Sequence, residues 1–391
     1  MDSSPNNPWA APLAKVCVIA TLFLIFIGAI VTTAGARMAA PNAPHVGGSL
    51  INPVSPLTGG AWYNDPALFK EHSHRLAAMT VGLGIGALCA MLWRNWLAFA
   101  VAVAFMGVGQ IGRKFGLSDV LVAQLRVWPA MVLFVTLLIV GARRRGEKPG
   151  VEAKLALVGY IAACIQAALG TLRVEIETGG NLALATNIRT FHGVFAQAFL
   201  VLIVILAARL SPVWQSLSGP HPAAAKIRRM AIIGMILYFA QLACAAYLRH
   251  RPGLWQAIAS WPAAQGDPGF SAGGSWLPAA WSHAVGIHFL HTRVLPVLLA
   301  GHLLGMGIGM LKRAAGTRLA PLGLWVIAAV VAQFALGVLM FAFATRAANG
   351  HPQAHITNTH VVLGALLVGL IALVFARAGR LQGGEGKVIC N

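Results

Sequence analysis

The stretch YIAACIQAALG, at Tyr160–Gly170, returns later in the chain as WVIAAVVAQFALG, at Trp325–Gly337. The glutamine and the final glycine of the two copies align. Each copy belongs to an apolar run of about 20 residues, which is the length of a helix that crosses a bilayer. The repeat therefore predicts a membrane protein that is built from two related halves.

The similarity continues on both sides of this stretch and includes four histidines. Downstream, NIRTFHGVFAQAFL contains His192 and NTHVVLGALLVGL contains His360. Upstream, EHSHR contains His74 and HFLHTR contains His291. The repeat thus predicts four helices in each half, two of which carry a histidine near their outer end.

The composition agrees with a membrane protein, because 58% of the 391 residues are hydrophobic and only 10% are charged. Soluble domains carry about a quarter charged residues. Ten candidate spans follow from the apolar runs, at roughly 15–36, 73–93, 95–112, 121–142, 153–172, 188–208, 230–248, 284–311, 321–343 and 357–376. We expect an all-α polytopic membrane protein with about 10 transmembrane helices, arranged as two pseudo-symmetric four-helix bundles.

The net charge of +19 could indicate a nucleic-acid partner, but its placement indicates a membrane. Lys and Arg cluster in alternate short loops and at the C-terminus, as in the positive-inside pattern. We therefore expect no nucleic acid, a lipid bilayer as the environment, and both termini on the cytoplasmic side. The clusters are Arg143, Arg144, Arg145 and Lys148; Lys226, Arg228 and Arg229; Lys312, Arg313 and Arg318; Arg377, Arg380 and Lys387.

The spacing of the histidines predicts an insertion in the first half. His74 and His192 are 118 residues apart, whereas His291 and His360 are 69 apart, and the difference of 49 matches the segment 95–144. We interpret that segment as an inserted transmembrane hairpin. The expected organisation is an N-terminal half at 1–208, an inside linker at 209–229, a C-terminal half at 230–376 and an inside tail at 377–391.

Four histidines at similar depth on related helices form two facing pairs, and such pairs commonly hold haem iron across a helical bundle. The alternative is that the histidines only contact lipid headgroups at the helix ends. Arg75 and Arg293 follow His74 and His291 and could bind haem propionates as forked donors. The alternative for each arginine is an interfacial side chain that extends to the headgroups.

Glu71 differs from the other acidic residues because it lies one helical turn before His74, on the same face of the helix. An ionisable group at the membrane edge is a candidate functional residue, although a carboxylate near a helix N-terminus is also favoured by the helix dipole. The second half has His288 at the matching place. The halves are therefore chemically unequal, which indicates that one half works on a substrate while the other serves as a fixed cofactor site.

These motifs together resemble the haem A synthase family (CtaA type). The resemblance rests on GAIVTTAG, EHSHR, IQAALGTLRV, FHGVFAQAF, AQLACAAYLRH, GIHFLHTR and NTHVVLGALL in this order, and it covers the chain except about 95–150. It implies an enzyme of the inner (cytoplasmic) membrane that oxidises a ring methyl of haem O to a formyl group, giving haem A for cytochrome oxidase. It also implies that Glu71, His74 and His192 form the substrate site, and that His291 and His360 ligate a haem b cofactor.

The chain departs from the family pattern in three places. The first outer loop reads AAPNAPHVGG, without the usual Asp and Trp or a cysteine pair; Thr292 separates His291 from Arg293; and the hairpin is additional. The expected partners are haem O, an electron donor that the sequence does not identify, haem O synthase as a candidate, and a second copy of the chain as another. A di-haem b electron-transfer cytochrome and a haem carrier without oxidation activity are the alternatives, and Glu71 distinguishes them from the synthase.

Overall fold

The computed structural model describes residues 7–36, 61–108, 119–217, 219–250, 277, 281, 283–344 and 351–382. These residues are almost entirely helical, and nine of their helical stretches are long and apolar enough to cross a membrane. The prediction of an all-α polytopic membrane protein is confirmed. The third predicted span, at 95–112, corresponds to α3 (Trp96–Val108), which is apolar but shorter than the other nine stretches. The first outer loop lies outside the described residues.

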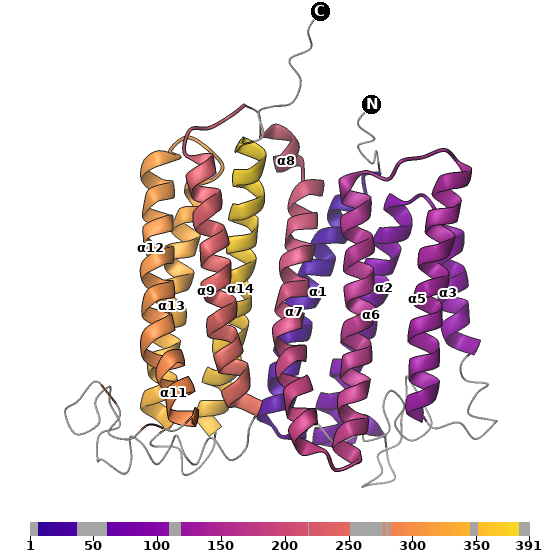
Figure 1. The fold of residues 1–391 in the computed structure, drawn as a ribbon, viewed down its shortest axis with the longest axis horizontal. Coiled ribbons are helices and arrows are strands. Elements are labelled where there is room, and N and C mark those ends of the chain that lie inside the picture. Colours follow the sequence, from indigo (N-terminus) through magenta and orange to yellow (C-terminus); the bar gives the residue numbers. More distant parts are fainter. Residues whose placement is uncertain are drawn as a thin grey trace, which may run out of the picture. The chain divides into compact units, whose positions relative to one another are not determined.

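The chain divides into two compact units, Met1–Leu210 and Ser211–Asn391, which we call unit 1 and unit 2. Four helices of unit 1 form a ring (Figure 1), namely α1 (Ala10–Thr33), α2 (Pro66–Leu92), α6 (Val151–Thr178) and α7 (Leu182–Leu210). Helices α1 and α6 each pack against both α2 and α7. As a result, α2 and α7 occupy opposite corners of the bundle.

The remaining two long helices of unit 1, α3 and α5 (Asp119–Arg144), pack against each other outside this ring (Figure 1). Helix α3 contacts α2, and α5 contacts α6. Contacts between aromatic side chains join this pair of helices to the bundle. The ring centroid of Phe134 lies 6.3 Å from that of Phe99 and 4.5 Å from that of Tyr160. This pair occupies the residues of the predicted hairpin.

Unit 2 repeats the ring of four. Its members are α9 (Ala224–His250), α13 (Ala320–Ala344), α14 (His351–Gln382) and a composite second helix. The composite helix runs from α11 (His283–Phe289) through η3 (Leu290–Val294) into α12 (Leu295–Arg313). Helices α9 and α13 each pack against α12 and α14, so that α12 and α14 are the opposite corners. The short helix α8 (Pro212–Ser216) precedes this ring.

The segment η3 is a single turn of π-helix inside an otherwise α-helical span. It contains His291, Thr292 and Arg293, where the sequence has one residue more than the EHSHR stretch of α2. A π-turn accommodates one extra residue within a helix. The insertion of Thr292 is therefore absorbed locally, and the helix continues on both sides of it.

Helix α2 begins at Pro66, earlier than the apolar run at 73–93 predicts. Asp65 caps it, because its side chain accepts hydrogen bonds from the backbone nitrogens of Ala67 and Leu68 at 3.0 and 3.1 Å. A short turn, η2 (Trp62–Asn64), comes just before this cap. The early start places the polar residues of the EHSHR stretch inside the helix.

Close contact between backbones holds α12 against α13. A Cβ atom added to Gly323 would lie 2.7 Å from the carbonyl oxygen of Gly307. Only glycine permits this distance, and small residues at helix interfaces are a common means of packing inside membranes. The contact therefore holds α12, the last part of the composite helix, close to α13.

Candidate haem sites

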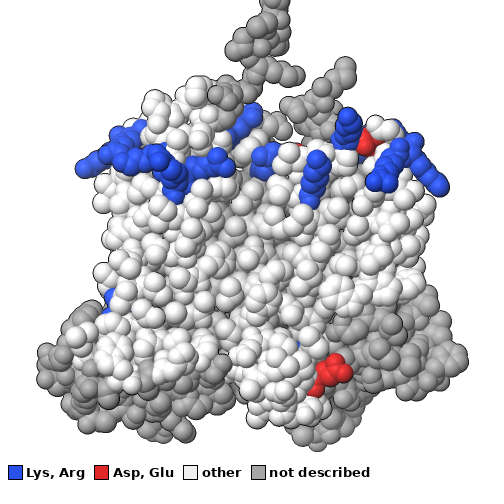
Figure 2. Space-filling view, viewed as in Figure 1, with Lys and Arg blue, Asp and Glu red and all other residues white. Residues whose placement is uncertain are grey.

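Most Lys and Arg side chains of each unit lie at one end of the ring of helices, and the candidate histidines lie toward the other end. Lys and Arg form a dense band at the basic ends (Figure 2). In unit 1 this end includes Arg94, Arg143, Arg144, Lys154 and Arg209, which are close to the starts or ends of their helices. In unit 2 it includes Lys226, Arg228, Arg229, Lys312, Arg313, Arg318, Arg377 and Arg380.

All four candidate histidines lie well inside their helices. His74 comes eight residues after the start of α2, and His192 ten residues after the start of α7. His291 comes eight residues after the start of α11, and His360 nine after the start of α14. At 1.5 Å per residue these offsets correspond to about 12–15 Å. The four imidazoles therefore share a similar depth in their bundles.

The two histidines of each unit come from opposite corners of the ring. His74 is on α2 and His192 on α7, while His291 is on η3 and His360 on α14. In unit 2, His360 lies near both His291 and Arg249. Each unit thus presents its pair across the bundle.

Glycines on neighbouring helices make room for three of the imidazole rings. A Cβ atom on Gly28 would lie 3.0 Å from Cε1 of His74. A Cβ on Gly170 would lie 3.5 Å from Cε1 of His192, and one on Gly337 would lie 3.4 Å from Cε1 of His360. Gly170 and Gly337 are the aligned glycines of the sequence repeat, and the structure gives both the same position beside a histidine ring.

Three glutamines on neighbouring helices contact three of the four histidines. The Nε2 atom of Gln166 donates to the backbone oxygen of His192 at 3.0 Å, and that of Gln241 donates to the backbone oxygen of His291 at 2.8 Å. Gln333 lies with its Nε2 atom 3.1 Å from Nε2 of His360. The repeat identified Gln166 and Gln333 as equivalent, but it did not predict these contacts, and Gln241 was missed.

The donor sets fit a haem rather than a metal held by protein ligands alone. No group of three His, Cys, Asp or Glu side chains gathers among the described residues, whereas haem iron takes two axial histidines. The Nδ1 atoms of His74, His291 and His360 are buried and make no hydrogen bond in the structure. If the Gln333 amide is turned so that its oxygen accepts from Nε2–H of His360, Nδ1 keeps the lone pair that iron needs.

Glu71 lies buried within α2, with 3% of its surface exposed. Its Oε1 atom accepts a hydrogen bond from Nη2 of Arg75 at 2.8 Å, one helical turn further along. Arg173 of α6 is a third charged residue beside this pair, because it interacts electrostatically with both Glu71 and Arg75. Arg173 also lies near His74. Arg75 is therefore engaged by Glu71, in addition to being a candidate for binding a propionate.

A second ion pair continues this group of charges onto α7. Arg189 donates to both carboxylate oxygens of Glu177 at 3.1 Å and to Oγ1 of Thr186 at 2.7 Å. The side chains of Arg189 and Glu177 are only 6% and 9% exposed, and their charges also act on Arg173. The pairing of Glu177 with Arg189 was not predicted from the sequence, because it forms only when α6 and α7 pack together.

Unit 2 has a different set of residues around its histidines. His288, one turn before His291, is buried with 6% of its surface exposed, in the place that Glu71 has in unit 1. Arg293 is 3% exposed, and its guanidinium lies over the ring of Phe289 at 5.8 Å. Arg249, at the end of α9, lies near His360. The inequality of the two halves that the sequence predicted is present in the folded chain.

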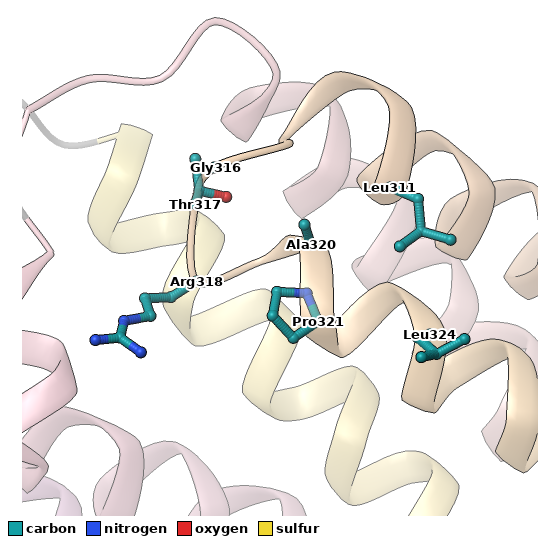
Figure 3. Close-up of a pocket in the computed structure, with 7 residues that line it drawn as sticks. All are labelled: Leu311, Gly316, Thr317, Arg318, Ala320, Pro321 and Leu324. Carbon is teal, nitrogen blue, oxygen red and sulfur yellow. The ribbon is translucent and has the colours of Figure 1, made fainter.

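A hollow of about 590 Å³ lies at the turn between α12 and α13, where the basic end of unit 2 is (Figure 3). Its walls are mainly aliphatic, with Leu311, Pro321 and Leu324 on one side and Arg318 extending away from them. The hollow is at the other end of the bundle from His291 and His360. It is therefore separate from the histidine sites.

Comparison with known proteins identifies the family. Residues 126–367 match the model of the COX15-CtaA family, which is described as a cytochrome oxidase assembly protein. The matched region includes His192, His291 and His360 and begins inside α5, whereas Glu71 and His74 precede it. No curated protein matches the chain. Because the family model spans more than half of the sequence, the resemblance noted from the motifs is confirmed, and the chain belongs to the COX15-CtaA family of cytochrome oxidase assembly proteins.

Proposed function

We propose that this protein is a haem A synthase, which oxidises a ring methyl of haem O to a formyl group. The family match supports a role in cytochrome oxidase assembly, for which haem A is needed. The proposed substrate site is the histidine pair of unit 1, His74 and His192. The proposed cofactor site, for haem b, is the pair of unit 2, His291 and His360.

One observation carries this assignment, namely that among the described residues a buried carboxylate accompanies the histidine pair of unit 1 and not that of unit 2. Glu71 and His288 each lie one turn before the first histidine of their unit, and both are buried. Oxidation of a methyl group builds positive charge on the carbon that is attached to the ring. A carboxylate in a site of low dielectric constant stabilises such charge, whereas a neutral imidazole does not.

The residues around Glu71 would position its carboxylate for this role. Arg75 holds one carboxylate oxygen at 2.8 Å, which limits the rotation of the side chain and keeps it on the face of α2 that carries His74. The glycine at position 28 lets the His74 ring lie against α1. In unit 2, haem b would supply electron transfer when it is bound, and His291 and His360 would be its axial ligands.

The conversion of a methyl to a formyl group removes four electrons and adds one oxygen atom. A redox partner is therefore required. Haem O synthase is the proposed source of the substrate. The basic ends of both bundles favour the cytoplasmic side of the inner membrane. This orientation places the haem sites toward the outer face.

The experiment is to supply haem O to the purified protein and to identify the extracted haems by mass. We expect haem B at about one per chain together with haem A, and a Glu71→Gln variant should lower conversion by about 100-fold or more. Glu175→Gln is the matched control, because Glu175 lies at the same end of the bundle and is exposed.

Two results would contradict the proposal. One is haem B at two per chain with no conversion of haem O, which would indicate an electron-transfer cytochrome. The other is a Glu71→Gln variant that converts haem O as fast as the Glu175→Gln control. The visible spectrum of the haem bound by His291 and His360 should be unchanged in both variants, which shows that the fold is retained.

A further inference from the structure

A buried ion pair ties α6 to α7 beside the proposed substrate site of unit 1. Arg189 of α7 donates from Nη1 to both carboxylate oxygens of Glu177 of α6 at 3.1 Å, and from Nη2 to Oγ1 of Thr186 at 2.7 Å. Both side chains of the ion pair are almost fully buried. Three hydrogen bonds, to acceptors on two helices, therefore hold the guanidinium of Arg189 in one place.

Arg189 is placed to control the orientation of His192. The two residues are three apart on α7, so their side chains share one face of that helix. Gln166 and Gly170 of α6 meet His192 itself, through the hydrogen bond to its backbone oxygen and the close approach to its ring. Glu177 adds an attachment between the same two helices, near the turn that joins them. Together these attachments fix the rotation of α7 about its axis, and with it the direction of the imidazole.

The same ion pair is connected to the carboxylate on α2. Arg173 of α6 interacts electrostatically with Glu71 of α2, with Glu177 of α6 and with Arg189 of α7. These charged residues thus join three helices, two of which, α2 and α7, carry the proposed ligand histidines. We therefore expect a change at Glu177 to reach Glu71 through Arg173.

The aligned positions of unit 2 carry residues that cannot form this group of charges. Counted from the aligned glycines and histidines of the repeat, the corresponding residues are Met340 for Arg173, Ala344 for Glu177 and Thr357 for Arg189. The glutamine and the glycine beside the histidine are, in contrast, present in both halves. Holding a histidine in such a bundle therefore does not require charges at these three positions.

A contribution to stability is a weak explanation for a buried ion pair. The cost of removing two charges from water can exceed the gain from their attraction, and apolar residues of similar volume are often at least as stabilising. Some buried pairs serve instead to select one arrangement of the segments that they join. In unit 1 the segments joined by the pair are α6 and the turn of α7 that leads to His192.

We propose that Glu177 and Arg189 are positioning residues for the proposed substrate site. They set the direction of the His192 ring, and through Arg173 they keep Glu71 on the face of α2 that carries the other histidine. The proposal rests on the proposed function, in which haem O lies between the two histidines of unit 1. Without the charge of Glu177, Glu71 is the one of these two carboxylates that still attracts Arg173, and it is drawn toward α6 and away from that face.

The test compares Glu177→Gln with Glu152→Gln in the purified full-length protein. Glu152 pairs with Arg209 at 2.7 Å, so that it also joins α6 to α7, but at the basic end of the bundle. With haem O as substrate, we expect Glu177→Gln to lower kcat by about tenfold or more and to change KM by less than about twofold, because misplaced reacting groups slow the chemical step. The control should match the unsubstituted protein in both constants.

A spectroscopic measurement distinguishes positioning from a merely structural role, and it does not depend on turnover. The electron paramagnetic resonance spectrum of low-spin ferric haem depends on the angle between its two axial imidazole rings. We load unit 1 with haem B in a His360→Ala background, which leaves only this site. Glu177→Gln should shift the g values, and Glu152→Gln should leave them unchanged. Arg189→Lys keeps the positive charge but lacks the second donor nitrogen, and it should shift them less, in the same direction.

A Glu177→Gln variant with the kcat and the g values of the Glu152→Gln control would overturn the inference and leave the proposed function intact. A raised KM with unchanged g values would also overturn it, because it would indicate weaker binding instead of misplacement. If Glu177→Gln does not fold, Arg189→Lys provides the same comparison with the control. If the unsubstituted protein does not convert haem O, the proposed function fails, and the g values alone decide whether these residues direct the ligand ring. A unit 1 that binds no haem would refute both.

Discussion

Replacement of Gly28 by alanine should weaken haem binding in unit 1 without unfolding the bundle. The added Cβ atom would lie 3.0 Å from Cε1 and 3.4 Å from Nδ1 of His74. Ordinary contact between carbon atoms begins at about 3.5 Å, so that the ring must retreat by about 0.5 Å. Overpacking of this kind costs about 1–3 kcal/mol. If the ring must return to bind iron, this cost appears as a loss of affinity of roughly 5–150-fold.

The bundle itself should tolerate the change, since alanine is favoured over glycine within a helix by about 1 kcal/mol. Gly170→Ala is the matched comparison, because its Cβ would meet Cε1 of His192 at 3.5 Å, which is an ordinary contact. Gly82→Ala is the control for the substitution alone, because nothing lies within 4 Å of the added atom.

The assay is a titration of each variant with haem B, followed by visible absorbance in a His360→Ala background that leaves only the unit 1 site. We expect about tenfold weaker binding for Gly28→Ala and less than about twofold change for the other two variants. Equal dissociation constants for all three would show that the ring of His74 has room to move, and the reasoning from the 3.0 Å contact would be refuted.

Two further predictions concern stability. Gly323→Ala places a Cβ 2.7 Å from the carbonyl oxygen of Gly307 and should lower the free energy of unfolding by about 1–3 kcal/mol. The control is Gly309→Ala, whose Cβ meets nothing within 4 Å and which should leave the stability unchanged. Thermal unfolding in detergent measures both variants, and equal melting temperatures would argue against the tight interface. Arg189→Gln breaks an ion pair whose side chains are 6% and 9% exposed and should cost about 3–5 kcal/mol, while Arg94→Gln, at a side chain 75% exposed, should cost less than about 1 kcal/mol. The same unfolding measurement would contradict this if the two variants lost equal stability.

The number of helices and the equivalence of the halves could be predicted from the sequence, because both depend on local properties. Apolar runs give the spans, and the match of Gly170 with Gly337 identifies the helices that precede His192 and His360. The start of α2 was harder to predict, because polar residues at 71–75 end the apolar run. Asp65 nevertheless starts the helix at Pro66, through hydrogen bonds that hydropathy does not register.

The surroundings of the histidines could be predicted only in part, because they depend on how the helices are rotated against each other. The spacing of Glu71 and Arg75 allows an ion pair on one helix face, and the pair is present. The pair of Glu177 with Arg189 joins two helices, and the contact of Gln241 with His291 joins two segments 50 residues apart. The hydrophobic periodicity of a helix shows which of its faces is apolar, but it does not show which neighbouring helix that face contacts.

The π-turn at Leu290–Val294 also has a consequence for tracing the history of duplicated proteins. One residue inserted into a regular helix turns everything beyond it by about 100° and shifts it by 1.5 Å. Because η3 contains the extra residue, the helical segments on both sides of Thr292 keep their orientation in the bundle. A residue-by-residue comparison of the halves would pair Arg75 with Thr292 and record a lost cation, whereas an alignment that opens a gap at the bulge pairs it with Arg293. Duplicated halves can thus diverge in length while their functional positions remain comparable.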